Sequence, residues 1–224
     1  MKAAIIGYGK MGHEIEDVLK EKGIEVAAII DPVCEAATAK EISAETLRDA
    51  DVCIDFTHPD CALKNVEAIA KIGKNIVLGT TGWYDDMTKM RKIVEDNSIG
   101  MIWASNFSIG VNVFFSIVEQ AARIFDRIPE YDVFSYELHH NQKADSPSGT
   151  AKTIGKILLE NISSKTELQT GRLDRPPRSE ELHLASVRAG NIPGTHVVGF
   201  DSQADTIQLK HQARSRKGFA LGAV

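Results

Sequence analysis

The amino-terminal stretch KAAIIGYGKMG, residues 2–12, decides the fold of the first half of this chain. Residues 2–6 form an apolar run typical of a buried β-strand, and three glycines follow with the spacing G-x-G-x-x-G. Residues 11–22 then have the apolar periodicity of a helix. Glycines at such a junction permit a tight turn and let the backbone approach a pyrophosphate at the helix start. The stretch predicts a dinucleotide-binding loop, with these candidate contacts: Gly7, Tyr8, Gly9, Lys10, Met11 and Gly12.

Asp31 ends the second predicted strand, residues 25–30. A carboxylate at this place accepts hydrogen bonds from an adenosine ribose and repels a ribose 2′-phosphate, which favours NADH over NADPH. Pro32 follows, so no cation stands directly beside Asp31, whereas Lys10 is close enough in sequence to leave use of both cofactors open. A strand-to-helix turn without a ligand remains the alternative for the glycine pattern taken alone.

Strands and helices alternate through the first half of the chain. Further strands are expected at residues 52–56, 75–78 and 101–104, with helices at about 61–72 and 84–96. This alternation predicts a parallel, doubly wound sheet with right-handed crossovers.

Small and hydroxyl side chains follow the fourth strand as Gly79, Thr80, Thr81 and Gly82. Ligands of doubly wound sheets bind outside the carboxyl ends of the strands, so these residues are candidates for approach by a nicotinamide ribose. An ordinary loop, with the threonines bonded to their own backbone, explains them equally well.

The pattern changes after about residue 106. A long apolar helix (111–125), a strand (131–139) and a second helix (151–161) precede several strand-like runs between residues 182 and 214. These features predict a second, mixed or antiparallel α+β domain with a meandering sheet. The polar residues 162–181 are expected to form an exposed excursion.

Residues 137–150 are the densest polar stretch of the chain. Ser148, Gly149 and Thr150 precede a predicted helix, whose free N–H groups bind carboxylates, although a plain Ser or Thr cap is the structural alternative. Histidine and lysine nearby supply positive charge and transferable protons. The segment predicts a pocket for a small dianionic, unsaturated substrate, which receives hydride from the first domain and a proton from the second. Adjacent histidines on a strand point to opposite faces, which argues against a metal site.

Composition excludes several classes of protein. The 224 residues carry 26 basic and 31 acidic side chains, a net charge of −5, which gives no sign of a nucleic-acid footprint. No apolar run is long enough for a membrane helix, and the first residues read as a strand rather than a signal peptide. Cys34, Cys53 and Cys61 match no metal-ligand spacing. We expect reduced thiols and a cytoplasmic protein.

Over nearly its whole length the chain resembles the 4-hydroxy-tetrahydrodipicolinate reductases, also called dihydrodipicolinate reductases. The segments that carry the resemblance are residues 7–12, 55–57 (DFT), 79–82 (GTTG), 106–112 (NFSIGVN), 187–190 (VRAG) and, most specifically, the HH, K and PSGTA motifs within 139–151. The order and combination of these motifs make the resemblance highly specific.

The resemblance implies a Rossmann domain (1–109 with 215–224) and an α+β domain (110–214) whose sheet builds a homotetramer. It implies reduction of 4-hydroxy-tetrahydrodipicolinate, with loss of water, to tetrahydrodipicolinate by NADH or NADPH, without a metal, in the diaminopimelate route to lysine. His139 matches the family's catalytic histidine and Lys143 its proton-donating lysine. The matching substrate contacts are His140, Gly149 and Thr150. The matching cofactor contacts are residues 7–12, Asp31, Gly79, Thr80, Thr81, Ser105, Asn106 and Phe107.

The sequence also departs from the family. Its glycine loop is one residue shorter than the common form, and Asn141-Gln142 replaces more basic residues. The family normally continues beyond residue 224 into a further helix. The competing hypotheses are another nicotinamide-dependent dehydrogenase, such as one acting on an amino acid, and a non-catalytic NAD-binding protein.

Overall fold

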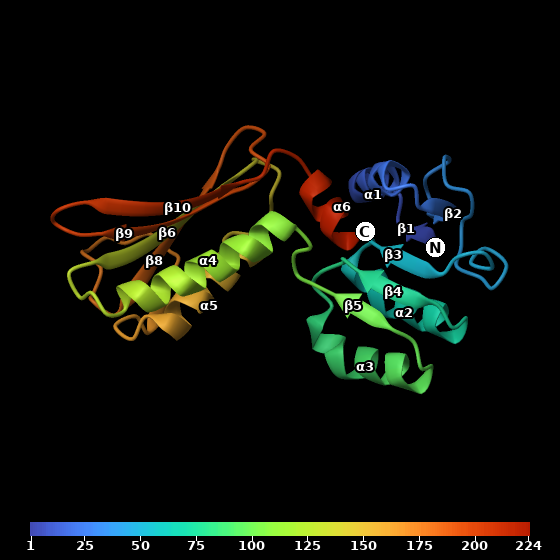
Figure 1. Ribbon diagram of the computed structural model, residues 1–224, viewed down its shortest axis with the longest axis horizontal. Coiled ribbons are helices and arrows are strands. Elements are labelled where there is room, and N and C mark those ends of the chain that lie inside the picture. The colour runs from blue at the N-terminus through green and yellow to red at the C-terminus, as the bar shows by residue number, and fades with distance from the viewer. The chain divides into compact units, whose positions relative to one another are not determined.

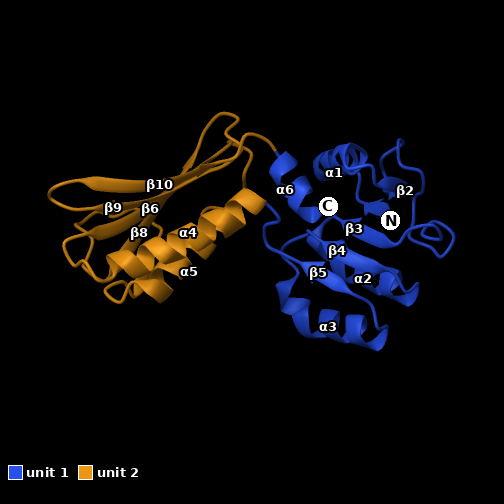
Figure 2. Cartoon of the chain, viewed as in Figure 1, with its two compact units in different colours: residues 1–108, 216–224 blue, residues 109–215 orange.

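The computed structural model describes residues 1–224, which form two compact units (Figure 2). Unit 1 comprises Met1–Ser108 together with Arg216–Val224, and unit 2 comprises Ile109–Ser215. None of the helices is both long enough and apolar enough to cross a membrane.

Unit 1 is built on a five-stranded parallel sheet in the order β2-β1-β3-β4-β5 (Figure 1). The strands are β1 (Lys2–Ile6), β2 (Glu25–Ile30), β3 (Val52–Asp55), β4 (Asn75–Leu78) and β5 (Met101–Trp103). The helices are α1 (Lys10–Glu21), α2 (Pro59–Lys71), α3 (Met87–Asp96), preceded by the 3-10 turn η1 (Tyr84–Asp86), and α6 (Lys217–Ala223). The doubly wound parallel sheet predicted from the alternating pattern is confirmed.

Both faces of this sheet are covered, because alternate residues of β1 enter different cores. Ala3 and Ile5 pack with Ile15 and Leu19 of α1 and with Ala220 of α6. Ala4 and Ile6 pack in the opposite core, to which α2 and α3 contribute. The strand order reverses between β1 and β3, the switch point at which doubly wound sheets bind ligands.

Unit 2 is a mixed five-stranded sheet in the order β10-β9-β6-β8-β7, with α4 (Ile109–Phe125) and α5 (Gly149–Asn161) packed together against one face (Figure 1). Its strands are β6 (Asp132–His139), β7 (Glu167–Gln169), β8 (Glu181–Arg188), β9 (Thr195–Asp201) and β10 (Thr206–Gln212). The predicted α+β class is confirmed.

The prediction of a meandering sheet is wrong in part. β8 and β9 are consecutive in sequence but not neighbours, because β6 lies between them, parallel to β8 and antiparallel to β9. The chain leaves β6, crosses through α5 and returns to a parallel strand, so this part is a βαβ arrangement rather than a meander.

Residues 162–181 are also more ordered than an exposed excursion. They contain the edge strand β7, and both Lys165 and Glu181 are buried. Lys165 pairs with Asp132 at 2.6 Å, and Glu181 pairs with Arg175 at 2.5 Å. The polar composition of the segment does not predict these ion pairs. One forms between two residues of the segment, and the other forms with Asp132 of β6.

Candidate active site

The glycine loop of unit 1 has the geometry of a phosphate cradle. Gly7 has a φ of +87°, and a Cβ there would lie 2.6 Å from the carbonyl oxygen of Phe56. A Cβ on Gly12 would lie 2.3 Å from the carbonyl oxygen of Gly7. Around Gly9, by contrast, a Cβ would meet nothing within 4 Å, immediately before the first turn of α1. The loop therefore packs tightly on its protein side and is open at the helix start, as a bound pyrophosphate requires.

Asp31 builds this loop as well as bordering it. One carboxylate oxygen accepts the N–H of Tyr8 at 2.8 Å, and the other accepts the N–H groups of Val33 and Cys34 at 2.9 and 2.8 Å. Partial burial opposes ionisation, but these three donors outweigh it and hold the pKa of Asp31 below its usual value. Asp31 is thus a fixed negative charge that still has acceptor capacity for a sugar hydroxyl.

The neighbouring loop side chains have defined partners of their own. The Tyr8 hydroxyl donates to Glu16, which raises the pKa of Tyr8 to about 12. Lys10 is exposed and Met11 half-buried. In the segment 105–107, the Asn106 side chain accepts the N–H of Ser108 at 2.8 Å, and Phe107 packs against Phe56.

Gly79 and Thr80 are held by contacts across the carboxyl ends of β3 and β4. A Cβ on Gly79 would lie 2.1 Å from the ring of Phe56, so only glycine fits beneath that ring. The Thr80 hydroxyl donates to Asp55 at 3.0 Å and accepts the N–H of Thr57 at 2.8 Å. Thr81 is exposed. The Thr80 side chain is thus committed to shaping the loop, and Thr81 is the hydroxyl left at its surface.

In unit 2, His139 lies at the end of β6 beside a buried carboxylate that the sequence reasoning missed. Glu137 is 0% exposed, and its Oε2 lies 3.2 Å from Nδ1 of His139 and 3.4 Å from Nε2 of His196. Its Oε1 accepts the Nη2 of Arg188 at 2.8 Å. Burial opposes ionisation of Glu137, but the histidines, Ser148 and Arg188 overcome it, and the pKa lies far below its usual range.

Ser148 serves as the cap of α5. Its Oγ accepts the N–H of Ala151 at 3.1 Å, and its own N–H donates to Glu137 at 2.9 Å. The next residue, Gly149, is exposed, and a Cβ there would meet nothing within 4 Å. Ser148 is thus the N-cap of α5, while Gly149 and Thr150 begin the helix and Gly149 leaves space beside its start.

Lys143 has a partner that the sequence did not indicate. Its Nζ lies 2.6 Å from Asp145, and the side chain of Lys143 is 24% exposed. Its positive charge contributes to lowering the pKa of His196, mainly lowered by burial, so Lys143 lies near the histidine cluster. The backbone N–H of His140 donates to the carbonyl of Ile192 at 2.8 Å, which ties the segment to the loop before β9.

Comparison with known proteins decides the family. The model of the dihydrodipicolinate reductase N-terminus matches residues 1–107, and that of the C-terminus matches residues 110–224. The 4-hydroxy-tetrahydrodipicolinate reductase of Christiangramia forsetii is 39% identical over all of this chain and 90% of its own length, and that of Archaeoglobus fulgidus is 42% identical over all of this chain and 91% of its own. The chain belongs to the dihydrodipicolinate reductase family.

A solved structure of the family agrees. The dipicolinate-bound dihydrodipicolinate reductase from Paenisporosarcina sp. TG-14 has a TM-score of 0.77 and 25% identity, covering 99% of this chain and 91% of that one. The resemblance inferred from the sequence motifs is thereby confirmed.

Glu137, His139 and His196 place their ligand-type atoms within 4.8 Å of one another, so they are the group to test for a metal site in this family member. The fit is poor, because the Arg188 guanidinium already pairs with the same carboxylate and would repel a divalent cation. The set fits an acid–base cluster better than a cation site.

Sequence reasoning gave no role to Glu137, Arg188 or His196, although Glu137 and Arg188 lie in the segments 137–150 and 187–190 that it singled out. Glu137 shares the buried face of β6 with His139 by strand alternation, so a signal existed. His196 and Arg188 lie 57 and 49 residues along the chain from His139, as their numbers show, and only the strand register brings them together.

Proposed function

We propose that this chain reduces 4-hydroxy-tetrahydrodipicolinate, with loss of water, to tetrahydrodipicolinate in the diaminopimelate route to lysine, using NADH or NADPH. The observation that carries the proposal is the family match of both halves, residues 1–107 and 110–224. The relatives named as this reductase support it, because they align along the whole chain. The reaction consumes one hydride and one proton and releases one water.

Unit 1 is proposed to hold the cofactor. Backbone N–H groups at the start of α1 and the open side of Gly9 would receive the pyrophosphate, and Asp31 would receive the adenosine ribose. The loops at 79–81 and 105–107 would border the nicotinamide half. The reduced nicotinamide, when bound, supplies the hydride.

Unit 2 is proposed to hold the substrate and move the proton. His139 is the catalytic histidine and Lys143 the proton donor, with His140, Gly149 and Thr150 contacting the carboxylates. The exposed start of α5 at Gly149 supports this assignment, since a helix N-terminus favours anions. Ser148 acts indirectly in this scheme by capping that helix.

NADH is the favoured cofactor. Asp31 is partly buried and its pKa is lowered, so it is ionised at neutral pH and would repel a ribose 2′-phosphate. Lys40 lies near enough to Asp31 to contribute to that lowered pKa, after the three backbone donors, and its positive charge would moderate the repulsion.

The protein is further proposed to be a cytoplasmic homotetramer that binds neither nucleic acid nor membranes. The sheet face not covered by α4 and α5 supports an assembly surface, because Phe134, Tyr136 and Leu138 are only half-buried there and Val187 is 46% exposed. Analytical ultracentrifugation of Val187→Lys against the unmodified protein tests this: loss of the tetramer supports the sheet interface.

The experiment that tests the activity is a coupled assay. Dihydrodipicolinate synthase makes the labile substrate from pyruvate and aspartate semialdehyde, and oxidation of NADH or NADPH is followed by absorbance. The proposal expects oxidation that depends on the synthase and is faster with NADH at limiting cofactor. A folded protein that binds NADH but shows no synthase-dependent oxidation would contradict it and favour another substrate or a binding role.

A further inference from the structure

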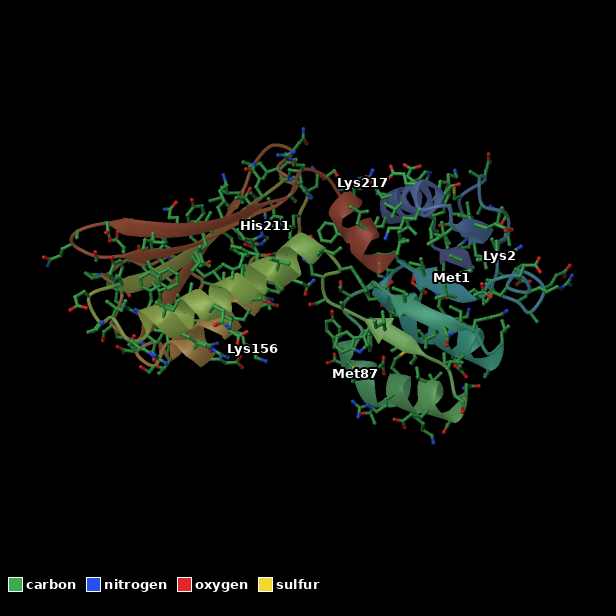
Figure 3. The ribbon with its side chains drawn as sticks, viewed as in Figure 1. Met1, Lys2, Met87, Lys156, His211 and Lys217 are labelled. Atoms are coloured by element: carbon green, nitrogen blue, oxygen red, sulfur yellow. The ribbon has the colours of Figure 1, made fainter.

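A row of polar side chains crosses the helix-covered face of the unit 2 sheet. In the register of the strands, Glu137 of β6 stands opposite Ser186 of β8 and His196 of β9, and His196 stands opposite His211 of β10 (Figure 3 labels His211). His139 follows two residues after Glu137 on the same strand face, so its ring borders this row.

The two oxygens of Glu137 have different surroundings. Oε1 accepts three hydrogen bonds, from the Ser148 N–H at 2.9 Å, the Ser186 hydroxyl at 2.9 Å and Arg188 at 2.8 Å. Oε2 faces only imidazole nitrogens, those of His139 and His196. Three donors on Oε1 fix the carboxylate in place and leave Oε2 directed at the histidines.

An ionised carboxylate only accepts hydrogen bonds, so a nitrogen facing Oε2 is stabilised when it carries a proton. Nδ1 of His139 and Oε2 of Glu137 are both buried, lie 3.2 Å apart and have no hydrogen-bond partner. The two atoms are at ion-pair distance without the direction of an ideal hydrogen bond, and the ionised Oε2 is the acceptor that favours a proton on Nδ1.

The other ring nitrogen of His139, Nε2, lies beside Gly194, where any larger residue would contact the imidazole ring. A Cβ on Gly194 would be 3.1 Å from Nε2 of His139, and Gly194 has a φ of +147°, which disfavours other residues. Gly194 therefore keeps the space beside Nε2 clear.

We infer that Glu137 is a positioning residue that holds His139 as the Nδ1–H tautomer, so that Nε2 is the atom that exchanges a proton with the substrate. The catalytic part of this inference rests on the proposed function, whereas the tautomer does not. Arg188 balances the charge of Glu137, and His196 shares Oε2 without taking over the role of His139. Charged or titratable groups that face this pair are Arg188 from β8, His196 from β9, His211 beyond it on β10, and the Lys143–Asp145 pair.

The test is histidine nitrogen NMR on the full chain without substrate. The protein has seven histidines, so His139→Gln identifies the His139 signals in ¹⁵N-labelled protein. At pH 8 the unmodified protein is expected to show the Nδ1–H tautomer at His139. An Nε2–H tautomer at His139 would overturn the inference. This measurement keeps Glu137 unchanged, so it does not depend on whether a Glu137 variant folds.

Glu137→Gln supplies the functional readout. Its amide oxygen can keep the Oε1 donors, which turns the amide N–H group toward Nδ1 and favours the wrong tautomer of His139. We expect kcat in the coupled assay to fall by about 10²–10⁴-fold with KM changed less than about threefold, because the wrong tautomer removes the acid–base contribution of His139.

Glu181→Gln is the matched control, because it removes another buried, arginine-paired carboxylate from the far end of the same sheet. It is expected to leave the His139 tautomer unchanged and kcat within about threefold of the value for the unmodified protein. Equal loss of kcat in both variants, with the tautomer unchanged in Glu137→Gln, would mean a merely structural role and contradict the inference. The predicted tautomer in a protein that lacks reductase activity would instead count against the proposed function alone.

Discussion

Asp55 in unit 1 and Glu137 in unit 2 are both 0% exposed, yet burial has opposite results for them. The partners of Asp55 are neutral: the amide of Asn65 and the hydroxyls of Thr57 and Thr80. Burial raises the pKa of Asp55, and these hydrogen bonds offset the rise only in part.

Glu137 has the cation of Arg188 and two imidazoles as partners, and its pKa is lowered despite burial. A cationic partner and imidazole donors favour the ionised form of Glu137, whereas Asp55 has only neutral donors to set against its burial. Unit 1 uses its carboxylate to join two loops, while unit 2 keeps a negative charge beside the candidate catalytic histidine.

The largest effect is expected from His139→Gln, because general acid–base groups contribute about 10²–10⁴-fold to rate. Turnover in the coupled assay should fall within that range, while the Kd for NADH, measured by fluorescence titration, stays within about twofold. His183→Gln, a half-buried histidine on β8, is the control and should keep normal turnover. Near-normal turnover of His139→Gln would contradict the assignment of proton transfer to unit 2.

The next largest effect is on the free energy of unfolding. It compares removal of the cation beside Glu137 with removal of the charge of Asp55. Arg188→Met leaves Glu137 buried without its cation and should lower the free energy of unfolding by about 3–5 kcal/mol. Asp55→Asn removes a charge that has only neutral partners and should cost about 1 kcal/mol. Urea unfolding measures both, and equal losses would contradict the comparison.

Asp31→Ala should lower the affinity for NADH relative to NADPH by about tenfold, which corresponds to about 1.4 kcal/mol. The variant removes the negative charge that disfavours a 2′-phosphate. It also leaves three backbone N–H donors without the carboxylate that accepts them, so both affinities should fall. Binding titrations with each cofactor test this, with exposed Asp17→Asn as the control. A larger loss for NADPH would show that Asp31 does not face the ribose.

The smallest effect is the dependence of stability on pH through His196 and His211. Burial lowers the pKa of each below 6.5 in the folded protein. The unfolded chain therefore takes up protons near pH 6.5 before the folded one does, so their contribution is complete above that pH and is lost as the pH falls through the folded pKa values. The slope should be at most about 1.4 kcal/mol per pH unit for each histidine.

Denaturant titrations between pH 7.5 and 5.5 measure that slope. His211→Gln should make it shallower, and the exposed His58→Gln should not. An unchanged slope in His211→Gln would mean that His211 is not neutral in the folded protein.

The parts of this molecule that the sequence predicts are those made by neighbouring residues. The glycine loop could be read from residues 2–12, because the strand, the turn and the helix start are contiguous. Asp31 could be placed at the loop for the same reason, although its three backbone donors could not be foreseen, since they depend on how the chain turns after β2.

The parts that it does not predict are made by strand register. The parallel pairing of β6 with β8 placed Arg188 beside His139, and the antiparallel pairing with β9 placed His196 beside Glu137. Nothing in the local sequence fixes the neighbours of β6. Its apolar pattern is compatible both with a parallel neighbour, reached through the α5 crossover, and with an antiparallel neighbour such as β9.

A pH titration of the side-chain carboxyl ¹³C signals of Asp55 and Glu137 in the folded protein measures the difference between the two buried carboxylates. Asp55 is expected to take up a proton at a pH above its usual pKa of 3.8, while the Glu137 signal stays that of an anion well below pH 4.5, as long as the protein remains folded. Protonation of Glu137 at or above 4.5 would remove the negative charge from His139 and contradict the account.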